Sequence, residues 1–254
     1  MNAYLITDLV GSSENSSELN GLFEKIDSEV QWLPDITHQG GALPRKFALQ
    51  CTVNENGDKP LYRHPMDQLP PTVEFTPTVN KIRLIIEKRL GISLNHAIIQ
   101  GYRDGNDHIT EHADKTIDVK PDSLIVNYSI GTPRIMKFRS KEPKSDGEYD
   151  IVDMELTNDS LCVLDLETNR FYKHSIRQNK AITGSRISLT FRSIGTFYNE
   201  ETKTIHGQGA PKEGLEPLTR EELCYAWSCE NRSSDVRYKE MYLRGYAKLG
   251  LSDE

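Results

Sequence analysis

Three side chains that can bind a metal ion occur along the chain in the order His112, Asp114 and His174. On an extended segment, residues two positions apart point to the same face, so His112 and Asp114 can bind one ion together. His174 can add a third ligand from a separate strand. Two imidazoles and one carboxylate on one face of an ion leave positions open for chemistry, as in non-haem Fe(II) oxygenase sites. These residues therefore predict a metal centre.

A strand with two arginines follows. In Arg186-Ile-Ser-Leu-Thr-Phe-Arg192 apolar and polar residues alternate, so one face carries the four polar side chains: Arg186, Ser188, Thr190 and Arg192. Burying arginines is costly unless an acidic group accompanies them. A guanidinium holds a carboxylate through two parallel hydrogen bonds, which a lysine cannot do. We therefore expect this face to bind a dicarboxylate such as 2-oxoglutarate.

Taken one at a time, these residues allow other interpretations. His174 alone is equally consistent with a packed core histidine, and the two arginines with solvent exposure on an edge strand. A zinc hydrolase could use the same three metal ligands, but it leaves the arginine-bearing strand unexplained. The order and spacing of the whole set favour the iron and dicarboxylate interpretation.

Composition limits the class of protein. The chain has 254 residues, 36% of them hydrophobic and 27% charged, which suits one large domain or one domain with extensions. No apolar run approaches the ~18 residues of a membrane span. The N-terminus lacks the pattern of a secretory signal, and the four cysteines form no C-x-x-C pair. We expect an intracellular protein, in the nucleus or the cytoplasm, with reduced thiols.

The formal net charge of −7 argues against binding of nucleic acid through a broad basic surface. Local clusters of lysine and arginine are present, and solvated surface is their simplest interpretation.

The hydrophobic pattern changes from helical to strand-like along the chain. Helical spacing predicts helices over residues 18–30 and 76–91, with Pro77 in a first turn and Gly91 as terminator. Residues 36–71 are rich in Gly, Pro and Asn and predict loops with short strands. Six β-rich segments follow, over residues 96–102, 123–130, 135–140, 149–156, 161–166 and 186–194. They predict an antiparallel sandwich or jelly roll with helices outside.

Helices return near the C-terminus. Thr219 and Glu222 form a capping box that opens one helix, and residues 236–251 predict another short one. We expect three regions: 1–71 as an N-terminal helix and substrate lid, 72–200 as the jelly-roll core, and 201–254 as a C-terminal helical extension.

Several segments resemble AlkB-like dioxygenases. Gln100-Gly-Tyr102-Arg-Asp-Gly105 with His108-Ile-Thr-Glu-His112-Ala-Asp114 looks like the segment that enters their iron site, and Arg186 to Arg192 is similar to their co-substrate strand. Leu43-Pro-Arg-Lys46, Thr168-Asn169 and Tyr172-Lys-His174 are similar to the eukaryotic DNA-repair members. The likeness covers roughly residues 40–200. The tail, with Gly207-Gln-Gly-Ala and Glu230-Asn-Arg-Ser-Ser, looks like a fungal branch.

The resemblance implies an α+β, mainly β fold: a double-stranded β-helix, or jelly-roll, core with flanking helices. It implies Fe(II) held by His112, Asp114 and His174, with 2-oxoglutarate and O₂ as co-substrates. Co-substrate contacts would come from Tyr102, Arg186, Arg192, Ser188 and Gln100. The family usually has Asn where Gln100 and Ser188 stand, so we expect rearranged 2-oxoglutarate contacts. Substrate contacts would come from Arg45, Lys46, Arg103 and Thr116.

The implied reaction is oxidative demethylation of alkylated bases in DNA or RNA by a monomeric enzyme. The N-methyl group is hydroxylated, and formaldehyde, succinate and CO₂ are released. A second hypothesis is the same chemistry on a protein or a small molecule. The negative net charge favours it, as does Lys115-Thr116 standing where repair members carry an acidic base reader. A third, an inactive jelly-roll binding domain, is disfavoured by the intact ligands and arginines.

Overall fold

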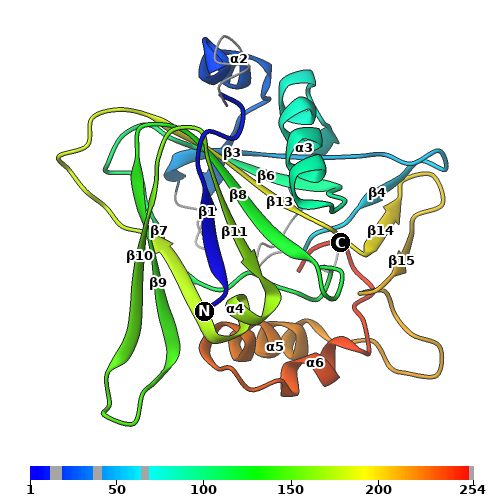
Figure 1. Cartoon of the computed structure of the whole chain (residues 1–254). Helices are drawn as coiled ribbons and strands as arrows, with labels where there is room; N and C mark the ends of the chain where they lie inside the picture. The colour runs from blue at the N-terminus through cyan, green and yellow to red at the C-terminus, as the bar shows by residue number, and fades with distance from the viewer. Residues whose placement is uncertain (12–18, 37–41, 64–68, 252–254) are drawn as a thin grey trace.

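The protein is built on two packed β-sheets with helices outside them (Figure 1). The computed structural model describes residues 1–11, 19–36, 42–63 and 69–251. The arrangement is the jelly roll expected from the strand pattern. Every helix in the described part of the chain is too short or too polar to span a bilayer.

The larger sheet has eight strands, and all its pairings are antiparallel except one. In spatial order its strands are β1 (Ala3–Ile6), β11 (Ser160–Asp165), β8 (Leu124–Gly131), β13 (Arg186–Arg192), β6 (His96–Tyr102), β3 (Ala42–Cys51) and β2 (Leu33–Ile36), with β5 (Thr72–Glu74) parallel to β3. The central position of β13 between β8 and β6 places the two predicted co-substrate arginines in the middle of the sheet.

Two smaller sheets complete the β structure. The first contains β10 (Tyr149–Leu156), β9 (Arg134–Pro143), β12 (Tyr172–Ile176) and β7 (Ile109–His112). It packs against the inner face of the large sheet through apolar side chains that include Tyr102, Ile125, Phe138 and Leu164. The second contains β15 (Thr204–Gly207), β14 (Thr196–Asn199) and β4 (Asp58–Pro60).

Helices α2 (Leu22–Glu29) and α3 (Pro77–Leu90) cover the outer face of the large sheet. The prediction for α3 is confirmed: Pro77 lies in its first turn, and Gly91 ends it in the left-handed conformation with φ 66°. The Glu29 carboxylate of α2 accepts a hydrogen bond of 2.9 Å from the backbone N–H of Thr78. One helix thus caps the next. Glu18, where the first helix was expected to begin, lies outside the described residues.

Three further helices lie elsewhere: α4 (Leu166–Phe171), α5 (Arg220–Arg232) and α6 (Arg237–Tyr242). The capping box of Thr219 and Glu222 at the start of α5 is confirmed. Figure 1 shows α5 and α6 together at the end of the molecule opposite α2 and α3.

The two faces of β13 explain why the strand alternates. Ile187, Leu189 and Phe191 are buried in the apolar cluster under α2 and α3. Arg186, Ser188 and Arg192 are also buried, on the inner face of the sheet. The strand therefore separates a dry core from a polar interior, as its period of two predicts.

Two sequence expectations are wrong. Residues 36–71 were expected to form loops with short strands, yet β3 is ten residues long and pairs with β2, β5 and β6. Adjacent Arg45 and Lys46 hide its alternation, because both faces of the strand take charged side chains. The last helix was expected over 236–251, yet α6 ends at Tyr242 and Gly245 follows with φ 71°.

Helix α4 was missed because six residues are too few to show helical periodicity. Its N-cap is Asp165, whose side chain accepts a hydrogen bond from the backbone N–H of Thr168. The proposed division of the chain at residues 71 and 200 stays a prediction, although β1, β2 and β3 hydrogen-bond within the same large sheet as the core strands.

A buried ion pair ties the C-terminal region to the core. Arg63 and Asp118 are 1% and 0% exposed in their side chains, and Arg63 Nη2 lies 2.6 Å from Asp118 Oδ1. The same guanidinium donates to the backbone carbonyls of Gly209 and Tyr246 at 2.8 and 2.6 Å. The guanidinium of Arg63 therefore holds the C-terminal region at two points, Gly209 and Tyr246.

We predict that Asp118→Asn lowers the free energy of unfolding by about 3–5 kcal/mol, because it leaves the buried Arg63 charge without its counter-ion. Urea denaturation measures the change. The control is Glu200→Gln, which removes the partner of Lys59 in a pair whose Glu200 side chain is 60% exposed. That change should stay within about 0.5 kcal/mol. Equal effects of the two substitutions would contradict the prediction.

Candidate active site

A cavity of about 660 Å³ opens between the two packed sheets. The large sheet lines it with polar side chains that include Gln100, Tyr102, Asn127 and Arg186, and the small sheet contributes His112 and His174. Helix α5 forms a further wall. Most residues predicted to do chemistry therefore face one cavity.

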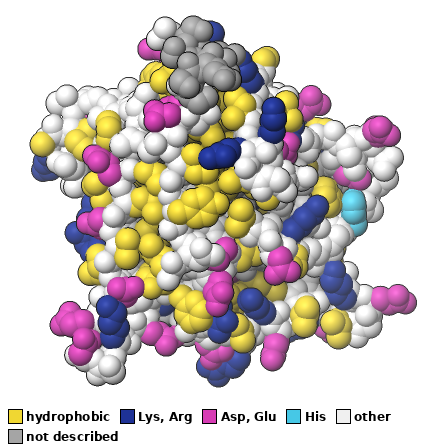
Figure 2. Space-filling view, viewed as in Figure 1, with side chains coloured by type: hydrophobic (Ala, Val, Ile, Leu, Met, Phe, Trp, Pro, Cys, Tyr) yellow, Lys and Arg dark blue, Asp and Glu magenta, His cyan; other side chains and the backbone are white. Residues whose placement is uncertain are grey.

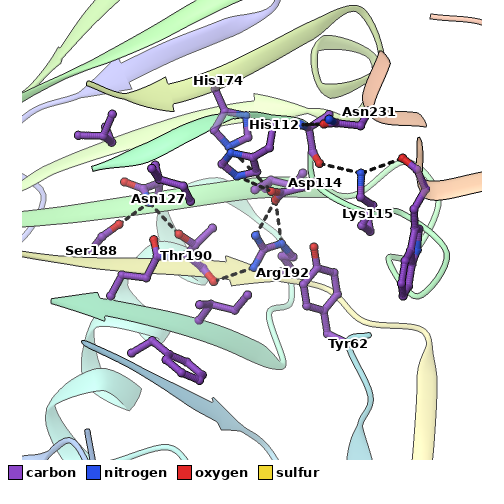
Figure 3. A pocket seen from close by; sticks show the side chains of 18 of the residues that line it. Tyr62, His112, Asp114, Lys115, Asn127, His174, Ser188, Thr190, Arg192 and Asn231 are labelled. Atoms are coloured by element: carbon purple, nitrogen blue, oxygen red, sulfur yellow. Dashed lines mark hydrogen bonds and ion pairs between the residues drawn. The ribbon is translucent and has the colours of Figure 1, made fainter. Parts of the chain in front are cut away.

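The three predicted metal ligands converge in this cavity (Figure 3). Strands β7 and β12 pair with His112 opposite His174, which brings together residues far apart in the sequence. Asp114 Oδ1 lies 3.8 Å from Nε2 of each histidine. One ligand atom from each residue lies within 4.8 Å of the other two. The set can hold one metal ion and leave its cavity side open.

Hydrogen bonds from several elements fix the segment that carries Asp114. Its backbone N–H donates to Asn169 Oδ1 at 2.8 Å, and Asn169 Nδ2 donates back to the Asp114 carbonyl at 2.9 Å. Arg192 donates to Asp114 Oδ2 from Nε and Nη2, at 2.9 and 2.6 Å. The backbone N–H of Ala113 donates to Asn231 Oδ1 at 2.8 Å. One carboxylate oxygen is therefore occupied, and the other faces the imidazoles.

The protonation states suit metal binding. Burial, and after it the neighbouring His112, lowers the pKa of His174 to about 3. Burial also lowers the pKa of His112. Burial alone would raise the pKa of Asp114, but Arg192 and the two imidazoles outweigh it and hold the pKa well below its usual value. Two neutral imidazoles and one carboxylate are the forms that bind a cation.

Arg186 lies deeper in the cavity with part of its guanidinium unused. Its Nη2 donates to Ser129 Oγ at 2.8 Å and to Asn127 Oδ1 at 3.2 Å. Nε and Nη1 are buried and have no hydrogen-bond partner among the described residues. The ring of Tyr102 lies with its centroid 5.1 Å from Arg186 Cζ. A buried cation with two free donors fits an incoming carboxylate.

Asn127 is the polar residue of this region that the sequence prediction missed. Its Nδ2 donates to Ser188 Oγ at 2.6 Å and to Thr190 Oγ1 at 2.7 Å, while its Oδ1 accepts from Arg186. A single Asn within the β-rich run 123–130 forms no sequence pattern that would predict this role. Gln100 Oε1 accepts from the hydroxyl of Tyr102 at 3.3 Å.

Of the four predicted substrate residues, only Arg45 lines the cavity. Lys46 follows it on the opposite face of β3, where it pairs with Asp27 at 2.7 Å and lies over Trp32. Arg103 pairs with Asp107 and its side chain is 59% exposed. We therefore leave Lys46 and Arg103 out of the proposed substrate site.

Thr116 points away from the cavity as well, because it is engaged by an acid from α5. Its backbone N–H donates to Glu230 at 3.0 Å, and its hydroxyl donates to the same carboxylate. Glu230 is 0% exposed and also accepts from the hydroxyl of Tyr242 at 2.6 Å. An acid, Glu230, therefore lies beside Thr116, but neither residue is among those that line the cavity.

The chain is similar to known oxygenases. Residues 2–192 match the 2OG-Fe(II) oxygenase superfamily. The chain is 28% identical to human DNA oxidative demethylase ALKBH2 over 187 residues, which cover 70% of this chain and 69% of that protein. It is 27% identical to the mouse protein of the same name over 188 residues, covering 70% and 76%.

A more distant relative is bovine alpha-ketoglutarate-dependent dioxygenase alkB homolog 3, with 24% identity over 187 residues, or 70% of this chain and 62% of that one. Among solved structures, OsALKBH1 shares the fold with a TM-score of 0.50 at 12% identity, covering 75% of this chain and 97% of that chain.

The jelly roll and the family match place the chain in the 2OG-Fe(II) oxygenase superfamily, to which it belongs. Within that superfamily it is AlkB-like. It is a 2-oxoglutarate-dependent dioxygenase that uses Fe(II), 2-oxoglutarate and O₂.

We predict that Arg186→Lys raises the KM for 2-oxoglutarate at least about tenfold, because an ammonium cannot make the paired hydrogen bonds of a guanidinium. Succinate formation against 2-oxoglutarate concentration measures it, and the shift of Tm with added 2-oxoglutarate gives a readout without turnover. The control is Arg237→Lys, at a side chain 86% exposed. An unchanged KM in Arg186→Lys would contradict the assignment.

We also predict that Co(II) affinity changes less than about tenfold between roughly pH 7.5 and 5.5. A protonated imidazole cannot bind a metal. The pKa of His174, about 3, keeps that ring neutral over this range, and the lowered pKa of His112 makes its ring less protonated than a free imidazole. Two imidazoles of ordinary pKa near 6.5 would weaken binding by roughly a hundredfold. Calorimetric titration at each pH distinguishes the two, and His174→Ala should abolish tight binding.

Proposed function

We propose that His112, Asp114 and His174 hold Fe(II), and that Arg186 and Tyr102 bind the distal carboxylate of 2-oxoglutarate. The observation that carries this assignment is the pairing of a three-ligand cluster with a buried arginine that has two free donors in one cavity. Arg192 then acts mainly by holding Asp114. The iron, when bound, supplies the oxidation of a C–H bond by O₂ coupled to decarboxylation of 2-oxoglutarate.

We further propose that the substrate is an N-methylated base of DNA. The relatives named as DNA oxidative demethylases in human and mouse support this choice. The cavity also continues past the metal ligands to Tyr62, Lys115 and Trp227, which leaves a compartment beside the iron for a flipped or single-stranded base. Hydroxylation of the methyl carbon then gives a group that leaves the nitrogen as formaldehyde.

The outer surface is consistent with a site that binds one nucleotide deeply. Figure 2 shows acidic and basic side chains interspersed on the face that it presents, without a continuous basic patch on the described part of that face. Affinity would then depend on the cavity more than on a long run of phosphate contacts. A monomeric state and a nuclear or cytoplasmic location stay predictions.

The test is incubation with Fe(II), ascorbate, 2-oxoglutarate and single-stranded DNA carrying one N-methylated base. The panel includes 1-methyladenine, 3-methylcytosine, 3-methylthymine and 1-methylguanine. We expect at least one oligonucleotide to lose the mass of one methylene group with matching succinate, and His174→Ala to abolish both. Succinate without any loss of mass would contradict a DNA substrate and favour a protein or small-molecule substrate.

A further inference from the structure

One wall of the cavity comes from outside the region shared with the family. The family match ends at residue 192, and α5 begins at Arg220. One face of this helix lines the cavity through Arg220, Cys224, Trp227, Ser228 and Asn231, at the spacing of a helical stripe. A part of the chain beyond the family match therefore faces the proposed substrate compartment.

Helix α5 is fixed to the segment that carries the metal ligands. Asn231 accepts from the backbone of Ala113, and Lys115 Nζ donates to the Trp227 carbonyl at 3.1 Å (Figure 3). From the next turn, the Glu230 carbonyl accepts a hydrogen bond from Lys141. The wall cannot shift without disturbing these contacts, so its side chains have defined positions relative to His112 and Asp114.

The wall offers hydrogen-bond donors that nothing in the described chain uses. Trp227 Nε1 is buried without a partner. Asn231 uses Oδ1 to hold Ala113, while its Nδ2 donates to no described residue, and Ser228 Oγ is also without a described partner. An unused buried donor costs free energy unless a ligand supplies an acceptor. A substrate with carbonyl oxygens would satisfy the buried Trp227 indole and would also offer acceptors to the half-buried Asn231 and Ser228 side chains.

The charges of the side chains around the cavity also favour a neutral substrate. Five of its lining side chains are basic, and Asp114 is the one carboxylate among the described lining residues. The basic residues are Arg45, Lys115, Arg186, Arg192 and Arg220. The charges of Fe(II) and the 2-oxoglutarate dianion offset each other, and those of Arg192 and Asp114 do so as well. The positive charges of Arg186 and Lys115 remain among the lining residues. A cationic base would be repelled, whereas a neutral one would not.

We propose that α5 reads the substrate base and selects a neutral ring with carbonyl oxygens beside the methylated nitrogen, as in 3-methylthymine, over a cationic ring such as 3-methylcytosine. The proposal rests on the proposed DNA demethylation. The two bases carry the methyl group at the same position, but 3-methylthymine presents two carbonyl acceptors and no charge. Glu230 is the acid that could offset a cationic ring, but its carboxylate accepts hydrogen bonds from Thr116 and Tyr242.

The reaction on this base balances with the known co-substrates. One O₂ and one 2-oxoglutarate are consumed for each methyl group. One oxygen atom enters succinate and the other enters the methyl carbon. The N–C bond then breaks, the ring nitrogen gains a proton, and formaldehyde leaves together with the CO₂ released from 2-oxoglutarate.

The test is competition between two single-stranded oligonucleotides that differ only in carrying 3-methylthymine or 3-methylcytosine. We expect kcat/KM to favour 3-methylthymine at least about tenfold. Asn231→Asp keeps the Oδ1 that holds Ala113 but replaces the donor by a negative charge, so the preference should move toward 3-methylcytosine by at least about tenfold. Trp227→Phe removes the indole donor together with part of a buried ring, so it should lower the melting temperature somewhat and slow 3-methylthymine selectively.

Tyr225→Phe is the control, because this side chain on the same helix is 62% exposed and does not line the cavity. It should leave the ratio unchanged. Fluorescence anisotropy with the metal-free protein checks that the variants change binding in the same order. A preference for 3-methylcytosine in the unmodified protein, or a ratio unaffected by Asn231→Asp, would overturn the proposal while demethylation itself stands. Demethylation of 1-methyladenine or 1-methylguanine with neither of these two oligonucleotides demethylated would overturn this proposal alone, and succinate without demethylation of any of the four bases would overturn both.

Discussion

The ion pair between Arg192 and Asp114 is the constraint on which the site depends. Both groups are buried, so each needs the other, and the short contacts to one carboxylate oxygen leave the second oxygen facing the two histidines. Arg192 comes from the centre of the large sheet, and Asn169 of α4 holds the Asp114 backbone from another side. The orientation of the proposed iron ligand is thus set by the sheet itself.

Contacts between neighbouring strands also shape the co-substrate region. The expectation that 2-oxoglutarate contacts are rearranged around Gln100 and Ser188 stays a prediction. The structure shows an amide supplied from the neighbouring strand: Asn127 reaches Ser188, Thr190 and Arg186 at once. One amide therefore links Arg186 to two hydroxyls of its own strand, since adjacent strands bring side chains of one face together.

The C-terminal region is part of the site and not an appendage. Asn231, Lys115 and Glu230 connect α5 to the segment that follows His112, while Arg63 and Asp118 connect the last turns to the core. Residues within the family match supply the proposed iron and co-substrate contacts, and α5, which follows that match, supplies one wall of the cavity. The proposed oxidation chemistry and the proposed recognition surface therefore come from different parts of the chain.

The sequence by itself determined the jelly-roll strands, helix α3, the capping box of α5 and the residues of the metal and arginine clusters. These follow from local rules, period-two alternation and cap chemistry, and from residue types with few other uses. Only the tertiary structure decided which side chains share the cavity. Lys46 next to Arg45 faces the other side of β3, Asn127 meets Arg186 across a strand pair, and Asn231 reaches Ala113 from a helix more than a hundred residues away. Such contacts depend on strand register and helix docking, which local sequence patterns do not encode.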